Sequence, residues 1–378
     1  MRRRSFLRGS ALATSALMAQ ESRPVLVPAG SRQKLAAIAA TYRMHSNADN
    51  LITRFLEGYW INEDYYRPSC DIASLYIDQV QAGDIGYRVS TAHRVPRMQS
   101  IPDALTLGTG RLAVDGVLLL GEDDGSPLSN AVVGPDLRFE FFEQMVAVFR
   151  KSGRSVPVFC AGYLSRDWDQ ARRMYQQSRE LGFPLMAGSS EAVSFRRPEL
   201  DYPLPAGFDD APWNGRAHPD DQLGVEFDDA LVLTPGGSQA SGIFSSLEVL
   251  QSLLERRRGG ESGIRSLECL VGSAVWRSAE QGRWSKELMK AALERAERLG
   301  KGLPEDVAHP AVCLIRYIDG TRGALLSLGG LVHELLAAFR VKHRREVDSM
   351  LCYTPIESRN DFSMLVHGIS LMMAGRCP

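Results

Sequence analysis

The chain has 378 residues, 44% of them hydrophobic and 24% charged, a composition typical of a soluble globular protein. At roughly 150 residues per domain, this length predicts two domains. Lysine and arginine total 44 and aspartate and glutamate total 45, so the formal net charge is −1. Such a balance excludes a global field that attracts nucleic acid or an anionic membrane, and we expect a small or neutral partner.

The N-terminus, MRRRSFLRGSALATSALMAQ, begins with arginines and continues into a short apolar stretch. The letters RRSFLR resemble the core of a twin-arginine export signal. The apolar stretch is far shorter than the roughly 18 residues that cross a bilayer, so no stable membrane span is expected. Residues 1–30 are therefore predicted to be an export signal and linker of a periplasmic or secreted protein. A disordered basic tail is the alternative.

The six cysteines are scattered and form no CxxC pair, which indicates neither a zinc site nor a disulfide framework. Four of them lie in apolar, strand-like runs, where buried free thiols are common: Cys160, Cys269, Cys313 and Cys352. The seven histidines are equally dispersed, and no metal is expected.

Strand-like and helix-like segments alternate from about residue 34 to residue 190. The apolar runs are short and lack strict alternation, as strands buried on both faces of a parallel sheet do. These runs are residues 35–40, 72–77, 114–120, 156–159 and 184–187. Helical patterns separate them. In SRDWDQARRMYQQSRELGFP one face of the helix is marked by Trp168, Ala171, Met174, Tyr175, Ser178 and Leu181. The alternation predicts an α/β, Rossmann-like, doubly wound parallel sheet.

After residue 190 the pattern changes. Residues 195–222 are rich in Pro, Gly and Asp and are typical of a long connection. Longer strand-like runs follow at residues 230–234, 264–271, 311–318 and 347–353, with helical patterns at 244–257, 278–298 and 363–373. Asp319 and Gly320 mark a hairpin turn. This half is predicted to be an α+β domain with a mostly antiparallel sheet and helices on one face.

Two arginine clusters have alternative interpretations. Arg196 and Arg197 are candidate substrate residues that would clamp an acidic group, and surface ion pairs are the alternative. Residues 256–258, three arginines at a helix C-terminus, are interpreted as a solvated cap and not as a nucleic-acid patch.

The order of elements resembles the glucose-fructose oxidoreductase, inositol dehydrogenase and rhizopine-catabolism family (Gfo/Idh/MocA), over about residues 34–375. In SLYIDQV, Asp78 stands where that family carries an acid for the ribose hydroxyls. The stretch VPVFCAGYLSRDWDQARRMYQQSRELGFPLMAGSS is similar to the strand, catalytic turn, helix and strand that end the family's cofactor domain. The resemblance implies a dinucleotide-binding-type domain over residues 31–190 and a substrate and oligomerisation domain over 191–378. It also implies NAD or NADP as cofactor, a sugar or polyol as ligand, and a homo-oligomer.

The positions that carry the chemistry depart from the family pattern. A dinucleotide turn needs glycines so that backbone N–H groups approach the pyrophosphate, but residues 40–45 read ATYRMH. Tyr42 and Arg43 would crowd the phosphate path, although an arginine can itself contact phosphate. Glu122 and its acidic neighbours follow the strand-like run at residues 114–120 and disfavour a pyrophosphate. The candidate cofactor-binding residues are Tyr42, Arg43, Asp78 and Glu122.

The catalytic positions differ as well. The family's Glu-Lys-Pro turn falls on residues 161–163 without its lysine, and its histidine and aspartate fall on Ser245 and Glu248. Serine lacks the near-neutral pKa of a histidine. Tyr163 is the candidate replacement, since a phenol at a strand's carboxyl end faces the crevice where such sheets bind ligands. Simple packing of Tyr163 at a domain boundary is the alternative.

Two functions remain open from the sequence. One is an exported oxidoreductase-like protein of the Gfo/Idh/MocA type that acts on a sugar or polyol with degenerate cofactor and catalytic motifs. The other is a non-catalytic carbohydrate-binding or scaffolding protein derived from that family.

Overall fold

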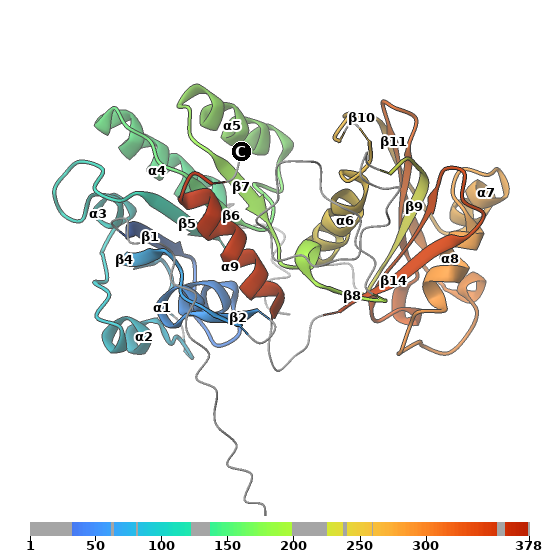
Figure 1. Cartoon of the computed structure of the whole chain (residues 1–378), viewed down its shortest axis with the longest axis horizontal. Helices are drawn as coiled ribbons and strands as arrows, with labels where there is room; N and C mark the ends of the chain where they lie inside the picture. The colour runs from blue at the N-terminus through green and yellow to red at the C-terminus, as the bar shows by residue number, and fades with distance from the viewer. Residues whose placement is uncertain are drawn as a thin grey trace, which may run out of the picture.

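A computed structural model of the chain describes residues 32–61, 64–80, 82–121, 137–198, 225–236, 240–258, 260–353 and 360–376. Two large sheets organise it, each with its own helices (Figure 1). The first sheet is parallel and the second is mostly antiparallel, which confirms the predicted fold class.

The first sheet has five strands in the order β4-β1-β5-β6-β7. Their bounds are β1 (Gln33–Ala39), β4 (Cys70–Ile77), β5 (Gly116–Leu120), β6 (Val158–Ala161) and β7 (Leu185–Gly188). All neighbours are parallel. Because the chain moves from β1 to β4 on one side and then to β5 on the other, the winding reverses at β1. Ligands of open α/β sheets bind beyond the carboxyl ends of the strands at such a reversal.

Helices cover both faces of this sheet. Leu35 and Ala37 of β1 pack toward one face, and Ala36 and Ile38 toward the other. On the second of these faces lie α3 (Ile101–Thr106), α4 (Leu137–Ser152) and α5 (Trp168–Glu180). On the first lie η1 (Asp49–Thr53), α1 (Arg54–Glu57) and the last helix, α9 (Asn360–Met373). The short α2 (Gly86–Ala92) and the hairpin of β2 (Tyr59–Ile61) and β3 (Asp64–Tyr66) complete this part of the fold.

The end of the chain thus returns to the first sheet. In α9, Val366 and Ile369 are fully buried in the same cluster as β1 and β4. Gly116 of β5 permits this close approach, because a Cβ there would collide with the sulfur of Met373. The division of the chain at residue 190 stays a prediction, to which the structure adds that α9 packs on the first sheet.

The second sheet has seven strands in the order β10-β11-β12-β9-β13-β14-β8. Only β12 and β9 are parallel. The bounds are β8 (Phe195–Arg197), β9 (Phe227–Thr234), β10 (Ile264–Val271), β11 (Ala311–Tyr317), β12 (Arg322–Ser327), β13 (Leu335–Val341) and β14 (Val347–Tyr353). Asp319 and Gly320 form the turn between β11 and β12, with Gly320 at φ 92°, as predicted.

The expectation of helices on one face of this sheet is wrong. Helix α6 (Ala240–Leu254) covers one face, whereas α7 (Ser273–Glu280) and α8 (Lys286–Leu293) cover the other. The region predicted as one helix breaks at Gly282, which has φ 70°. Val275 and Leu288 then pack against the sheet from two short helices, opposite to α6 (Figure 1).

The interpretation of residues 256–258 as a solvated cap is also wrong for two of the three arginines. Arg256 is 7% exposed, and Arg257 is only 3% exposed. Its guanidinium donates to Asp319 at 2.6 Å and to Ser262 at 2.8 Å and lies 4.6 Å from the centre of the Tyr317 ring. The hairpin turn folds back over the end of α6, so this cation is buried with a carboxylate and an aromatic ring.

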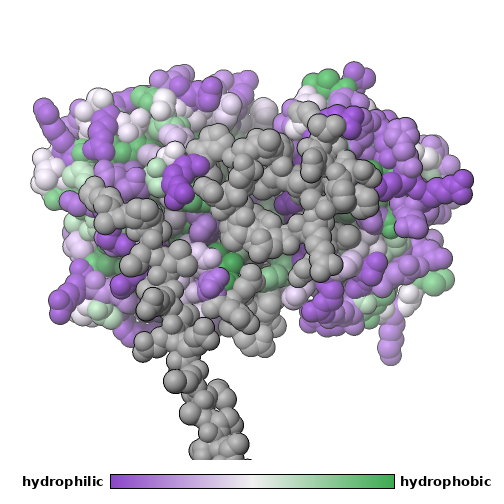
Figure 2. Space-filling model, in the orientation of Figure 1, coloured by the Kyte–Doolittle hydropathy of each residue, from purple (hydrophilic) through white to green (hydrophobic). Residues whose placement is uncertain are grey.

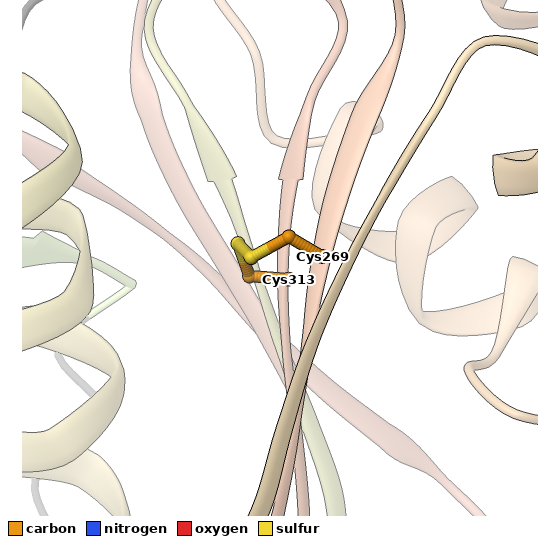
Figure 3. Close-up of a disulfide and its surroundings, with 2 residues drawn as sticks. All are labelled: Cys269 and Cys313. Carbon is orange, nitrogen blue, oxygen red and sulfur yellow. A yellow bond between two sulfur atoms is a disulfide. The ribbon is translucent and has the colours of Figure 1, made fainter.

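Cys269 and Cys313 form a disulfide (Figure 3), contrary to the expectation of free thiols. The two residues face each other directly in the antiparallel pair of β10 and β11. Opposite residues of antiparallel strands bring their Cβ atoms within bonding range, which isolated sequence runs do not reveal. Cys70, Cys160 and Cys352 are buried free thiols, as expected.

The disulfide leads to a stability prediction. It closes a loop with a sequence separation of 44, and the chain-entropy model gives a stabilisation of up to about 4 kcal/mol for such a loop. We expect the double substitution Cys269→Ser/Cys313→Ser to lower the free energy of unfolding in urea. The Cys70→Ser variant keeps the disulfide, so a reducing agent should still lower its free energy of unfolding. Peptide mapping in which both Cys269 and Cys313 are alkylated in the unreduced protein would contradict the assignment.

Candidate functional site

The turn after β1 satisfies its own backbone groups. The N–H of Arg43 donates to Ser46 Oγ at 3.2 Å, and the N–H of Asp49 donates to the same oxygen at 3.2 Å. The N–H of His45 donates to the carboxylate of Asp49 at 2.9 Å. A pyrophosphate needs free N–H groups at this position and is repelled by a carboxylate. The residues of this turn therefore do not fit the pyrophosphate of NAD or NADP.

Tyr42 belongs to the core of the first domain. Its side chain has no exposed surface, and its hydroxyl pairs with Thr53 Oγ1 at 2.9 Å. Burial raises the pKa of this phenol. The ring lies against Gly86 at the start of α2, where a Cβ would come within 3.2 Å of it. Tyr42 thus anchors the turn to the core of the first domain.

The other candidate cofactor residues are placed separately. Arg43 is half-buried and forms a backbone bridge with Asp84. Asp78 is exposed just after β4, and its carboxylate accepts the Tyr76 hydroxyl at 2.8 Å. Burial and this carboxylate raise the pKa of Tyr76 to about 12. Glu122 lies outside the described residues. The cofactor roles of Tyr42 and of these three candidates stay predictions.

Tyr163 lies where the two domains meet. Its ring packs edge-to-face on Phe244 of α6, with 5.6 Å between ring centroids. On the same ring lies the guanidinium of Arg138, which comes from α4 and is 4.2 Å from the ring centre. The Tyr163 hydroxyl is buried and has no hydrogen-bond partner among the described residues. An orphaned buried hydroxyl is costly, so this one is a candidate to bind a ligand.

Glu248 crosses the same boundary from the other side. It extends from α6 to the end of β7, where its carboxylate accepts the backbone N–H of Ser189 at 2.8 Å and also the Ser189 hydroxyl. Gly188 leaves room for it, since a Cβ there would lie 2.7 Å from Glu248 Oε1. Burial raises the pKa of Glu248 to about 7 although both bonds to Ser189 oppose the shift.

The structure therefore brings two predicted site residues to one place. Phe244 and Glu248 are four residues apart in α6, so they share the helix face that meets Tyr163 and Ser189. Ser245 is half-buried on the same helix. This arrangement offers a ring, a hydroxyl and a carboxyl group that gains or loses a proton near neutral pH.

Three members of the site were missed in the sequence. Ser189 could have been found, because it directly follows a strand of the parallel sheet. Phe244 and Arg138 carry no such signal, since their positions depend on how α6 and α4 dock.

Arg196 and Arg197 lie in β8 at the edge of the second sheet. Arg196 is buried, and its Nη2 lies 3.4 Å from the carbonyl oxygen of Ala192. Arg197 is exposed, forms an ion pair with Glu297 and lies 4.5 Å from the centre of the Tyr353 ring. These contacts agree with the surface-pair interpretation of Arg197, and a substrate role for either arginine stays a prediction.

Within the described ranges, no group of three or more His, Cys, Asp or Glu side chains is arranged to hold a metal ion. A search of the same ranges finds no helix with the length and apolar character needed to cross a membrane.

No protein-family model matches the chain, and no curated protein sequence does. Solved structures do match. UDP-N-acetylglucosamine 3-dehydrogenase GnnA from Acidithiobacillus ferrooxidans has a TM-score of 0.51 at 11% identity, over 92% of this chain and 90% of that chain. GenD2 from gentamicin A biosynthesis, whose structure is a complex with NAD, has a TM-score of 0.51 at 15% identity, over 93% and 91%. Myo-inositol 2-dehydrogenase from Lactobacillus plantarum has a TM-score of 0.51 at 8% identity, over 91% and 89%. The chain thus has the fold of the Gfo/Idh/MocA sugar and inositol dehydrogenases along nearly its whole length.

The site predicts a pH-dependent stability. Because the pKa of Glu248 is raised from 4.5 to about 7, its contribution to the free energy of unfolding is full below pH 4.5 and is lost as the pH rises through 7. Relative to Glu248→Gln, the wild-type protein should therefore lose on the order of 2 kcal/mol between pH 5 and 8. Urea unfolding at several pH values measures this loss. The exposed residue Glu294 supplies a control, Glu294→Gln, which should parallel the wild type. If the free energy of unfolding of Glu248→Gln changes with pH as that of the wild type does, the assignment is contradicted.

Proposed function

We propose that this protein binds a sugar or polyol at the junction of its two domains and does so without a dinucleotide. The observation that carries the proposal is the turn after β1, where Ser46 and Asp49 accept the N–H groups that a pyrophosphate would need. The protein is then a non-catalytic carbohydrate-binding descendant of the Gfo/Idh/MocA fold.

The junction has the chemistry that such a ligand requires. Sugars and polyols present C–H faces and many hydroxyls, which suit aromatic rings beside a few fixed polar groups. Tyr163 and Phe244 supply the rings, and the free Tyr163 hydroxyl supplies a donor and an acceptor. Glu248 supplies a carboxyl group that is held in place by a hydrogen bond from Ser189. Residues of both domains thus contribute to the site.

A dinucleotide-dependent oxidoreductase acting on a sugar or polyol is the second candidate. It is favoured by the exposed carboxylate of Asp78 at the end of β4 and by the solved relatives of this fold, one of which holds NAD. In that case NAD or NADP would need contacts other than the turn after β1. The two candidates therefore differ first in whether a dinucleotide binds.

Export through the twin-arginine route is part of the proposal. Two features support it: the RRSFLR stretch near the N-terminus and the disulfide between Cys269 and Cys313. Disulfides persist mainly in oxidising compartments, such as the periplasm and the extracellular space. The homo-oligomer implied by the resemblance stays a prediction.

Calorimetric titration of the folded protein with NAD, NADH, NADP and NADPH distinguishes the candidates. We expect no dissociation constant tighter than about 1 mM for any of the four, because Ser46 and Asp49 already accept three of the turn's N–H groups. A micromolar constant together with a rise in melting temperature would contradict the proposal and favour the oxidoreductase. A cooperative melting curve of the protein without any dinucleotide confirms that the sample is folded.

The ligand contact is tested separately with myo-inositol and glucose as probes. Tyr163→Phe removes one hydrogen-bonding hydroxyl and keeps the ring on Phe244, so we expect several-fold weaker binding. Tyr66→Phe, which alters a half-buried phenol elsewhere in the first domain, is the matched control and should bind as the wild type does. Equal affinities for all three proteins would remove Tyr163 from the site.

A further inference from the structure

Helix α5 exposes a row of aromatic and basic side chains. Trp168 is 76% exposed and Tyr175 is 57% exposed, and Arg172 and Arg179 are exposed as well. These four residues follow one another at intervals of four, three and four, so they lie on one side of the helix. We call them the α5 stripe.

The α5 stripe divides a face that the sequence pattern predicts as one. The pattern groups Trp168 and Tyr175 with Met174 and Ser178, whereas the buried residues of α5 are Met174, Gln177 and Ser178, and both rings are exposed. Two large rings therefore stand in solvent, where they contribute nothing to the core. An aromatic group in this position is a candidate for binding a partner.

The spacing of the rings suits a chain of sugars. Seven residues of helix place Trp168 and Tyr175 about 10 Å apart along the axis. This distance is close to the length of two linked pyranose rings, so alternate sugars could stack on the two side chains. Arg172 lies between the rings, and Arg179 lies one helical turn beyond Tyr175. Guanidinium groups at these positions match carboxylates carried on the sugars.

The α5 stripe begins close in sequence to the proposed ligand site. Trp168 is the first residue of α5, only five positions after Tyr163. Helix α5 packs on the first sheet through Met174 and lies next to α4 (Figure 1). A sugar chain with one end at Tyr163 would therefore meet Trp168 first and Tyr175 next.

We propose that the α5 stripe binds an acidic oligosaccharide, one that carries carboxylates on its sugars, and so extends the site at Tyr163. The inference rests on the proposed function, because it takes the ligand at the junction to be a sugar. At present Arg172 makes an exposed ion pair with Asp169 at 3.4 Å. Such exposed pairs contribute little, so a carboxylate of the ligand can replace Asp169.

Two other occupants fit the observations less well. Trp, Tyr and Arg are all enriched at protein interfaces, but the core of such an interface is a more apolar and closely packed patch than two rings set among charged side chains. On the face seen in Figure 2, hydrophilic side chains predominate over the first domain, and the apolar residues lie in small separate groups. Single-stranded nucleic acid also stacks on aromatic rings, but it needs a strongly basic surface, and the net charge of the chain is −1.

Binding of hexagalacturonate, with neutral cellohexaose as its uncharged counterpart, tests the inference. We expect the wild-type protein to prefer the acidic hexasaccharide. Trp168→Ala/Tyr175→Ala should weaken binding of both hexasaccharides by about tenfold or more, since each ring contributes on the order of 1 kcal/mol. Arg172→Gln/Arg179→Gln should abolish the preference and leave the affinity for cellohexaose unchanged. Val80→Ala, which removes an exposed apolar side chain from another part of the first domain, is the control.

The outcomes separate this inference from the proposed function. If myo-inositol or glucose binds but hexagalacturonate binds no more tightly than cellohexaose, the α5 stripe is not an acidic-sugar site, while the junction site stands. If hexagalacturonate binds equally well to the wild type and both double variants, the inference is also overturned. Loss of dimerisation in Trp168→Ala/Tyr175→Ala, measured by light scattering, would assign the stripe to a second copy instead. Tighter binding of a single-stranded oligonucleotide than of hexagalacturonate would assign it to nucleic acid.

Discussion

The contact between Glu248 and Ser189 holds the candidate site together. A carboxylate from α6 reaches the end of β7 and accepts two hydrogen bonds, so an element of the second domain is fixed to the edge of the first sheet. Glycine at position 188 leaves room for this approach, because a Cβ there would lie 2.7 Å from Glu248 Oε1. With α6 so placed, Phe244 meets Tyr163 one helical turn earlier. The aromatic part of the site thus depends on a buried carboxyl group whose ionisation opposes its burial.

The turn after β1 differs from a dinucleotide-binding turn. Dinucleotide-binding turns leave backbone N–H groups free, and glycine makes this possible by allowing a tight turn. Here Ser46 and Asp49 accept these N–H groups, so the turn is stable without any ligand. The strand, the turn and the start of the helix are all present, but these N–H groups donate to side chains of the protein and not to a bound anion. Under the proposed function, cofactor binding is lost without any change in the fold.

The sequence predicted the architecture well because its evidence was distributed over many residues. Strands buried on both faces and helices with regular apolar spacing recur along the first domain, so an error in one segment changes little. Details that depend on one neighbour were not predictable. Cys269 meets Cys313 only because β10 and β11 pair in one register, and Arg257 is buried only because a hairpin turn folds over it.

The candidate site was predicted only in part, because some of its features depend on how neighbouring elements dock. Tyr163 and Glu248 could be named from their places at a strand end and on a helix, and the structure places them at one junction. Trp168 and Tyr175 were misplaced because their spacing fits either side of an amphipathic helix, and docking of α5 through Met174 decided which side is buried.

Hydrogen exchange measured by mass spectrometry, with and without ligand, distinguishes a turn that bonds to itself from one that binds a dinucleotide. We expect NADH to leave the exchange of residues 40–50 unchanged, because the N–H groups of Arg43 and His45 already bond within the turn. We also expect myo-inositol to slow exchange in the segments that contain Tyr163 and Ser189. Protection of residues 40–50 by NADH, with no effect of myo-inositol at the junction, would contradict the proposed function.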